Sequence, residues 1–165
     1  MYFITGNHEQ KSQYGRLAVD FMKSQQATLL DQQSVKLVLD QHFIWLSGVG
    51  ADMAEIETHI KDMKAPDHHF QILLCHYPHL IDHYVRAQYD LVLSGHAHGG
   101  HWRIGAQGLF APDQGFIPTY TKGLYQKEKT SMIVSAGLGN SLMPLRLNNY
   151  PNLVLITLQT SKQGL

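Results

Sequence analysis

The sequence is organised around one stretch, Leu93-Ser94-Gly95-His96-Ala97-His98-Gly99-Gly100-His101, which places three imidazoles within six residues. The apolar run 89–93 leads directly into it, as a buried strand would. Neutral imidazole is the commonest metal ligand in proteins, and side chains two apart on an extended backbone point the same way. The glycines permit a tight turn and leave room for an ion and a substrate. The stretch therefore predicts part of a metal site, which other parts of the chain must complete.

The composition is that of a globular protein with a hydrophobic core. Of the 165 residues, 44% are apolar and 16% are charged, which excludes a disordered chain. Thirteen basic residues balance thirteen acidic ones, and this argues against a nucleic-acid binder and against a polybasic membrane anchor. No apolar run approaches the roughly 20 residues of a transmembrane helix. The sole cysteine, Cys75, excludes an internal disulfide and fits a reducing compartment, so we expect a cytoplasmic protein.

Short apolar segments alternate with amphipathic ones along the chain. Strands are predicted at 2–4, 28–31, 35–39, 43–47, 70–75, 89–93, 132–135 and 153–158, and helices at 10–25, 53–63 and 80–87. Gly and Pro interrupt the region 105–124, which predicts no long element there. The alternation predicts an α/β layered fold in a single domain over residues 1–165. Because the chain opens inside a strand, we expect this domain to be truncated at its N-terminus.

Three of the predicted strands are followed at once by groups that can bind a metal: 2–4 by Asn7 and His8, 70–75 by His76, and 89–93 by His96 and His98. Ligand sites in α/β sheets lie at the carboxyl ends of strands, so we expect these groups to converge. Imidazole nitrogen combined with amide oxygen suits Zn²⁺, Mn²⁺ or iron. His101 is expected to contact the substrate, and Arg103 either to hold a phosphate bidentately or to form a surface salt bridge.

These residues resemble a known family. Gly6-Asn7-His8-Glu9, the strand-end His76 and Gly95-His96-Ala97-His98-Gly99-Gly100 are similar, in order, to three of the five signature blocks of calcineurin-like metallophosphoesterases. Further similarity to a bacterial phosphodiesterase branch runs through Leu109-Phe110-Ala111-Pro112, Gly115-Phe116, Tyr120, Gly123-Leu124-Tyr125 and Ser135-Ala136-Gly137-Leu138-Gly139. The resemblance covers nearly the whole chain. It implies the C-terminal part of a four-layer α/β/β/α sandwich.

The resemblance also implies a mechanism and a set of roles. In the family, two metal ions hold a bridging hydroxide that attacks a phosphorus atom in line, and Mn, Fe, Zn and Ni serve as these ions. By resemblance, Asn7, His76 and His96 bind one metal and His98 binds the other. His8 contacts the phosphate and protonates the leaving oxygen. The implied substrates are phosphodiesters, small-molecule phosphoesters, or nucleotide-sugar and lipid-linked pyrophosphates. The alternative to a cytoplasmic location is the membrane periphery, and the sequence leaves open an upstream anchor or signal.

The chain departs from the family pattern in two ways. It lacks the two upstream blocks, Asp-x-His and Gly-Asp-x-x-Asp, which supply most ligands of the first metal and the bridging carboxylate. We therefore expect at most one ion to bind well and hydrolysis by this chain alone to be impaired. A partial sheet also exposes a strand edge, so we expect self-association there. In addition, His101 stands where this branch commonly has Gln.

Two other interpretations compete with a metallophosphoesterase. The chain could be a non-catalytic metal- or phosphate-binding remnant of a truncated phosphoesterase, which would bind one ion or none. Metallo-β-lactamase-type hydrolases also use His-x-His. They require an Asp-His pair directly afterwards, whereas Gly99-Gly100 follow here, so this interpretation is disfavoured.

Overall fold

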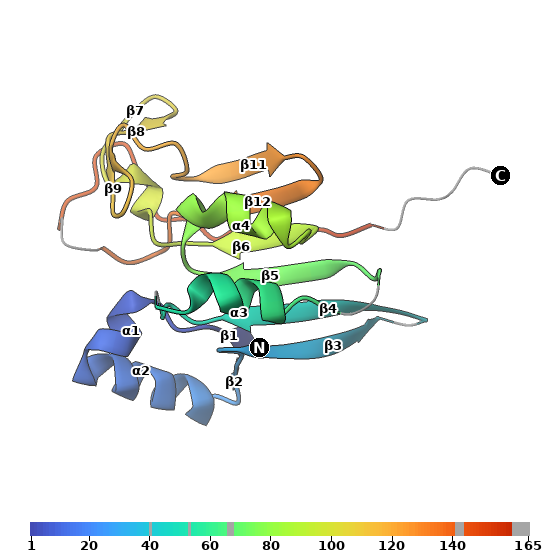
Figure 1. Ribbon diagram of the computed structural model, residues 1–165. Helices are drawn as coiled ribbons and strands as arrows, with labels where there is room; N and C mark the ends of the chain where they lie inside the picture. The colour runs from blue at the N-terminus through green and yellow to red at the C-terminus, as the bar shows by residue number, and fades with distance from the viewer. Residues whose placement is uncertain (40, 53, 66–67, 141–143, 160–165) are drawn as a thin grey trace.

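The central element is a six-stranded mixed sheet (Figure 1). The computed structural model describes residues 1–39, 41–52, 54–65, 68–140 and 144–159. The strand order is β11-β12-β6-β5-β4-β3, with β3 Gln33–Leu39, β4 His42–Val49, β5 Gln71–Cys75, β6 Leu91–Ser94, β11 Gly123–Lys127 and β12 Thr130–Val134. The four inner strands run parallel, and the edge strands β3 and β11 are antiparallel to their neighbours. The α/β fold predicted from the sequence is confirmed.

Helices α3 (Ile56–Asp62) and α4 (Ile81–Arg86) cover one face of this sheet (Figure 1). The main core lies between these helices and the sheet and includes the fully buried Leu73, Val92 and Met132. Two tyrosines are also fully buried there, and each hydroxyl donates to a backbone carbonyl, that of Tyr84 to Tyr77 and that of Tyr89 to Ile60. This face is therefore packed, and the hydroxyls of its two buried tyrosines have hydrogen-bond partners.

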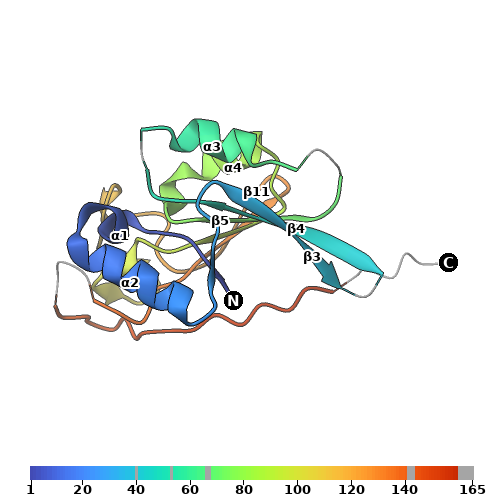
Figure 2. The same cartoon turned by 90° about the horizontal axis from the view of Figure 1, so that it is seen from below.

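The opposite face is covered less completely. A two-stranded parallel sheet, β1 (Tyr2–Phe3) with β2 (Thr28–Leu29), lies on this side together with the extended segment 151–159 (Figure 2). Four residues are buried here: Leu30, Leu46, Ile72 and Leu91. Eight aliphatic residues around them are only partly buried: Ile4, Val35, Leu37, Ile44, Leu74, Leu93, Ile133 and Ile156. We call this surface the open face. Helices and sheet on one side with a second small sheet on the other agree with the implied sandwich.

Most of the predicted elements occur, with some corrections. The predicted helix 10–25 is two helices, α1 (Asn7–Lys11) and α2 (Gln13–Ser24), because Ser12 Oγ accepts a hydrogen bond from Gly15 N and so starts α2 afresh. The helix predicted over 53–63 is shorter, and Met53 lies outside the described residues. The strand predicted at 153–158 is wrong: the segment is extended but pairs with no strand in the described chain. Strand β11 was missed because Gly123 and Lys122 look like loop residues.

The remaining segments connect β6 to β11. A short 3-10 turn, His98–Gly100, is followed by two small antiparallel pairs, β7 (Arg103–Ile104) with β8 (Gln107–Gly108) and β9 (Phe110–Ala111) with β10 (Gly115–Phe116). A second 3-10 turn, Pro78–Leu80, leads from β5 into α4. In the part of the chain that the structure describes, no helix is long and apolar enough to cross a membrane.

Candidate metal centre

Three side chains that follow strand ends meet at one point. Asn7 is the first residue of α1, His76 follows β5 and His96 comes two residues after β6. His76 Nε2 lies 3.1 Å from Asn7 Oδ1 and 3.1 Å from His96 Nδ1. The two imidazole rings are 4.8 Å apart between centroids and meet edge to face at 66°. The structure brings these three predicted metal ligands together, and their binding of a metal stays a prediction.

The backbone that presents Asn7 is held by two carboxylates. Thr5 N donates to Asp31 Oδ1 at 2.9 Å, and the Thr5 hydroxyl donates to the other oxygen of that carboxylate. Gly6 N donates to Glu9 Oε2 at 2.9 Å, a local bond that steadies the start of α1. A Cβ atom at position 6 would lie only 2.8 Å from Glu9 Oε2 and 3.2 Å from the His76 Nε2 atom. The turn therefore needs glycine in order to pass beneath the imidazole of His76.

The two histidines are neighbours because their strands are neighbours. Strands β5 and β6 run parallel, with Leu74 opposite Leu93, so their carboxyl ends emerge side by side. Gly95 N donates to the carbonyl of His76 at 3.3 Å, which continues the contact past the ends of the strands. The position of His76 relative to His96 thus follows from the sheet itself.

A carboxylate determines where His96 carries its proton. Asp113 Oδ2 lies 2.8 Å from His96 Nε2, and an ionised carboxylate can only accept. In a neutral imidazole the proton is therefore on Nε2, and Nδ1 presents a lone pair toward His76. Asn7 Oδ1 presents a second lone pair to the same His76 nitrogen. A single proton, that of His76 Nε2, is shared between these acceptors, and a cation could take its place.

The imidazoles of this cluster favour the neutral form. Burial, followed by the nearby imidazoles of His96 and His98, lowers the pKa of His76 to about 3. Burial also lowers the pKa of His96, although the hydrogen bond that its Nε2 donates to Asp113 opposes this. Neutral imidazole is the form that binds metals, so the nitrogens are ready to act as ligands near neutral pH.

The donor set suits one divalent ion of the Zn²⁺, Mn²⁺ or iron type, for which imidazole and oxygen ligands are usual. Within the described ranges, no group of three or more His, Cys, Asp or Glu side chains forms a metal site. The third donor of the present group is the amide oxygen of Asn7, which such a group does not include. Two imidazoles and an amide carry no negative charge, and this limits how strongly they can hold a cation.

A second pair of histidines lies beside the first group. The rings of His98 and His101 stack at 5.4 Å, and His101 stacks in turn on Phe110 at 5.8 Å. Burial, followed by His101 and the guanidinium of Arg146, lowers the pKa of His98 to about 4. Asn149 fixes the backbone of this turn, because its Nδ2 donates to the carbonyls of His98 at 2.6 Å and of His101 at 3.1 Å.

The other predicted site residues lie at the edge of this region. His8 is exposed on α1, close enough for its charge to lower the pKa of His76 and of His96 after burial and nearer charges. The guanidinium of Arg103 donates to Gly99 O at 2.6 Å and to Thr121 Oγ1 at 3.1 Å. These bonds tie the turn His98–Gly100 to the loop before β11. The catalytic role of His8 and the substrate-binding roles of His8, His101 and Arg103 stay predictions.

Three residues that act on the histidines of the site were not identified from the sequence: Asp113, Arg146 and Asn149. Asp113 reaches His96 across 17 residues, and Asn149 reaches His98 across 51 residues. Such contacts leave no local pattern. A weak signal exists for Asp113, since it lies in a Pro-Asp-Gln-Gly turn where Asp is common for conformational reasons alone.

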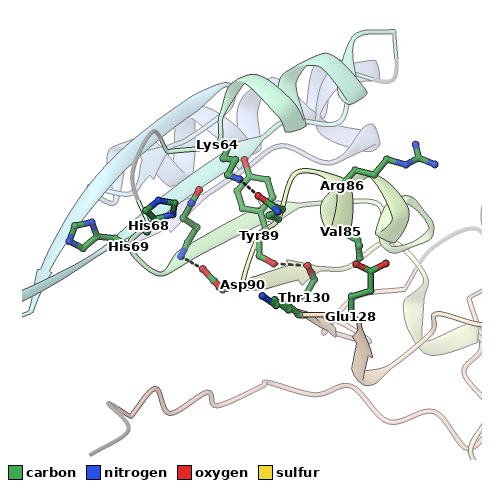
Figure 3. A pocket seen from close by; sticks show the side chains of 12 residues that line it. Lys64, His68, His69, Val85, Arg86, Tyr89, Asp90, Glu128 and Thr130 are labelled. Atoms are coloured by element: carbon green, nitrogen blue, oxygen red, sulfur yellow. Dashed lines mark hydrogen bonds between the residues drawn. The ribbon is translucent and has the colours of Figure 1, made fainter. Parts of the chain in front are cut away.

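A hollow of about 650 Å³ lies at the opposite end of the same strands (Figure 3). Its lining residues come before β5, before β6 and from the β11–β12 turn, and they carry charges of both signs. Two of its polar groups are already engaged: Lys64 Nζ donates to Gln88 Oε1 at 2.8 Å, and Asp90 Oδ2 accepts from Gln71 N at 2.8 Å. No predicted metal ligand lines this hollow, so it is separate from the candidate metal centre.

Comparison with known proteins identifies relatives of the chain. The uncharacterized metallophosphoesterase YkuE of Bacillus subtilis is 35% identical over 96 residues, which are 58% of this chain and 33% of that protein. An uncharacterized metallophosphoesterase of Campylobacter jejuni is 31% identical over 173 residues, 98% of this chain and 42% of its own. An uncharacterized metallophosphoesterase of Aquifex aeolicus is 27% identical over 174 residues, which are 96% of this chain and 60% of that protein. No protein-family model and no solved structure matches the chain significantly.

All three relatives are named as metallophosphoesterases. The resemblance found in the sequence is thereby confirmed, and the chain belongs to the calcineurin-like metallophosphoesterase family. The chain spans between about a third and three fifths of the length of these relatives. The boundary of the single domain over residues 1–165 stays a prediction.

Proposed function

We propose that this protein takes part in metal-dependent hydrolysis of phosphoesters, with its candidate metal centre as the reactive site. The observation that supports this most directly is the convergence of Asn7 Oδ1, His76 Nε2 and His96 Nδ1, with 3.1 Å between His76 and each of the others. These atoms come from separate elements, and only the folded chain brings them together. Family membership supports the same reaction class.

In this proposal, Asn7, His76 and His96 hold one divalent ion, and His98 belongs to a second ion of the dinuclear family centre. Bound metal would supply an acidified water molecule and would offset the charge that develops on the phosphate. His8 is exposed at the rim of the cluster, where its imidazole can contact a phosphate and give a proton to the leaving oxygen. The chain's own ligands include no bridging carboxylate, so we expect at most one ion to bind well and turnover to be impaired.

The proposed substrates are phosphodiesters or related small phosphoesters, including lipid-linked pyrophosphates, and the proposed location is the cytoplasm or the membrane periphery. The test is hydrolysis of bis-p-nitrophenyl phosphate by the 165-residue chain with Mn²⁺, Fe²⁺, Zn²⁺ or Ni²⁺. We expect slow, metal-dependent release of nitrophenol that His76→Ala abolishes and that His83→Ala preserves. His83 is a suitable control because it lies on α4 and pairs with Glu57, at 3.3 Å. Hydrolysis that His76→Ala leaves unchanged would refute the proposal.

A second candidate function is metal or phosphate binding without catalysis. The observation that favours it is the neutral charge of the three converging donors, which form no His, Cys, Asp or Glu metal site in the described residues. The same experiment separates the two functions. Zn²⁺ or Mn²⁺ binding that depends on His76, with no release of nitrophenol under any metal, would favour the non-catalytic function.

We also propose self-association through the open face. Leu153 and Leu155 are 84% and 94% exposed on the extended segment 151–159, and Ile156 of the same segment packs against the aliphatic residues of the open face. No backbone hydrogen bond joins residues 153–159 to another described residue, whereas β1 has a strand partner, β2, on one side only. Each copy thus offers both a strand-forming segment and an unpaired strand edge, and a second copy supplies the complement of both.

A further inference from the structure

Asp113 is presented to His96 by the tip of a small hairpin. Strands β9 (Phe110–Ala111) and β10 (Gly115–Phe116) pair antiparallel, and Pro112, Asp113 and Gln114 form the turn between them. Asp113 has φ +58°, a left-handed conformation that Asp tolerates better than most residues. Its Oδ2 lies 2.8 Å from Nε2 of His96, whose own side chain is only 5% exposed.

The hairpin is anchored on both sides of this carboxylate. On one side, Ala111 is fully buried in the main core. On the other, the Gln114 side chain holds Tyr120 at both polar groups of its backbone: Nε2 donates to Tyr120 O at 2.8 Å, and Tyr120 N donates to Oε1 at 2.9 Å. The carboxylate is thus mounted on a fixed support.

The hairpin is also joined to the end of the turn His98–Gly100 and to the residues that follow it. Leu109 N, directly before β9, lies 3.2 Å from the carbonyl of Gly100 and 2.8 Å from that of Trp102. Backbone hydrogen bonds therefore join the hairpin that carries Asp113 to the segment that follows His96 and His98. A surface ion pair between mobile side chains would have neither this anchoring nor a buried imidazole.

We propose that Asp113 is the positioning residue of the metal centre: it holds the proton of His96 on Nε2 and thereby directs the lone pair of Nδ1 toward the metal. The inference rests on the proposed function, since it names the nitrogen through which His96 acts. A carboxylate on the far nitrogen of a ligating imidazole fixes its tautomer, orients its ring and raises its basicity. Asp113 also brings a negative charge to a donor set that has none of its own.

The proposal makes a specific distinction between the two ring nitrogens. Nε2 cannot act as the ligand, because it faces the carboxylate at 2.8 Å. Nδ1 can, because it faces His76 and, through His76, Asn7. The role of Asp113 is exerted through His96, so its loss must be visible on the imidazole even when no metal is present.

Two variants isolate the carboxylate. Asp113→Gly removes it at a position whose positive φ suits glycine, so the backbone is not strained. Asp113→Asn keeps the shape but removes the charge, and Asn also tolerates this φ. The control is Asp20→Asn, which makes the same chemical change on the exposed surface of α2. Two quantities are measured: the ¹⁵N shifts of the His96 ring without metal, assigned by means of His96→Gln, and the Kd for Zn²⁺ alone.

In the natural sequence we expect protonated Nε2 and bare Nδ1. Asp113→Gly should give a mixture of tautomers and bind Zn²⁺ about 10- to 100-fold more weakly, Asp113→Asn should fall between, and Asp20→Asn should change neither quantity. An unchanged tautomer and an unchanged Kd in Asp113→Gly would overturn the proposal while leaving the metal centre intact. If the natural chain bound no Zn²⁺, the proposed function would fail, but the ¹⁵N shifts would still test the role of Asp113. A proton on Nδ1 of His96 in the natural chain, or a tautomer that Asp113→Gly leaves unchanged, would refute that role.

Discussion

Nε2 of His76 lies 3.1 Å from Nδ1 of His96, although 20 positions separate the two residues along the chain. The contact arises because each residue lies just beyond one of two adjacent parallel strands, whose carboxyl ends open on the same edge of the sheet. When both imidazoles are neutral, they have one proton, that of His76 Nε2, for two acceptors, His96 Nδ1 and Asn7 Oδ1. The arrangement makes sense when a cation binds between them and the amide oxygen of Asn7.

Removing one of these imidazoles should greatly weaken metal binding. We expect His96→Ala to weaken the binding of Zn²⁺ at pH 7.5 at least about 100-fold, because one of three ligands and its orienting partner are lost together. Isothermal titration calorimetry measures this directly. His83→Ala, on the surface of α4, should bind as the natural chain does. Equal affinity in His96→Ala and the natural chain would show that the ion binds elsewhere.

The strand ends could be predicted from the sequence, because an apolar run followed by polar ligands is a local pattern. The residues that position these ligands could not be predicted from the sequence. Asp113 lies on a hairpin whose place beside His96 depends on contacts from Gln114 and Ala111 to other parts of the fold. No spacing in the sequence encodes such contacts.

Two errors in the fold prediction have physical causes. The apolar spacing of 10–25 suits one helix, but the hydroxyl of Ser12 caps a new one, and capping outweighs propensity at a helix start. The composition of 153–158 suits a strand, but a strand forms only against a partner, and this segment pairs with no strand of the described chain. Pattern therefore identified what these segments favour, while tertiary context decided what they form.

Acid should destabilise the metal-free protein through its buried histidines. The pKa of His76 is about 3 when folded, against about 6.5 when unfolded. Between these values the unfolded chain binds the extra proton, so stability is full above pH 6.5 and falls as the pH drops toward 3. The loss from this one histidine should be about 1.4 kcal/mol per pH unit at most. Urea unfolding from pH 7 to pH 4.5 in EDTA measures it.

The matched comparison for this pH dependence is His76→Gln, which cannot take up the proton. Its free energy of unfolding should fall less steeply between pH 6.5 and 4.5 than that of the natural chain. The two slopes should differ by about 1.4 kcal/mol per pH unit, the value for uptake of one proton on unfolding. His98, with a pKa lowered to about 4, contributes in the same direction and remains in the variant. Parallel curves for the two proteins would mean that His76 is not buried in its neutral form.

The turn after His98 should require glycine at position 99. Gly99 has φ +66°, and a Cβ there would lie 2.2 Å from Asn149 Oδ1. Gly99→Ala must therefore displace the amide that holds the carbonyls of His98 and His101. We expect a loss of about 2–5 kcal/mol in the free energy of unfolding, from left-handed strain and steric overlap together. Urea denaturation measures the loss.

Gly105→Ala is the control for the steric part of this prediction. Gly105 has a similar φ of +57°, and nothing lies within 4 Å of its added Cβ. Its substitution should cost only the strain, about 1–2 kcal/mol. If both variants lost the same stability, the contact between position 99 and Asn149 would not be important for the turn.

The open face should make the chain self-associate in a concentration-dependent way. Light scattering after size exclusion should show dimers whose fraction rises with protein concentration. Leu155→Lys places a charge on the most exposed leucine of segment 151–159 and should shift the protein to monomer, because a buried charge opposes an apolar interface. Ile104→Lys is the matched control: Ile104 is 72% exposed, but it lies on β7, outside the open face. A natural chain that stays monomeric at all concentrations, or a dimer that Leu155→Lys leaves intact, would refute association through this face.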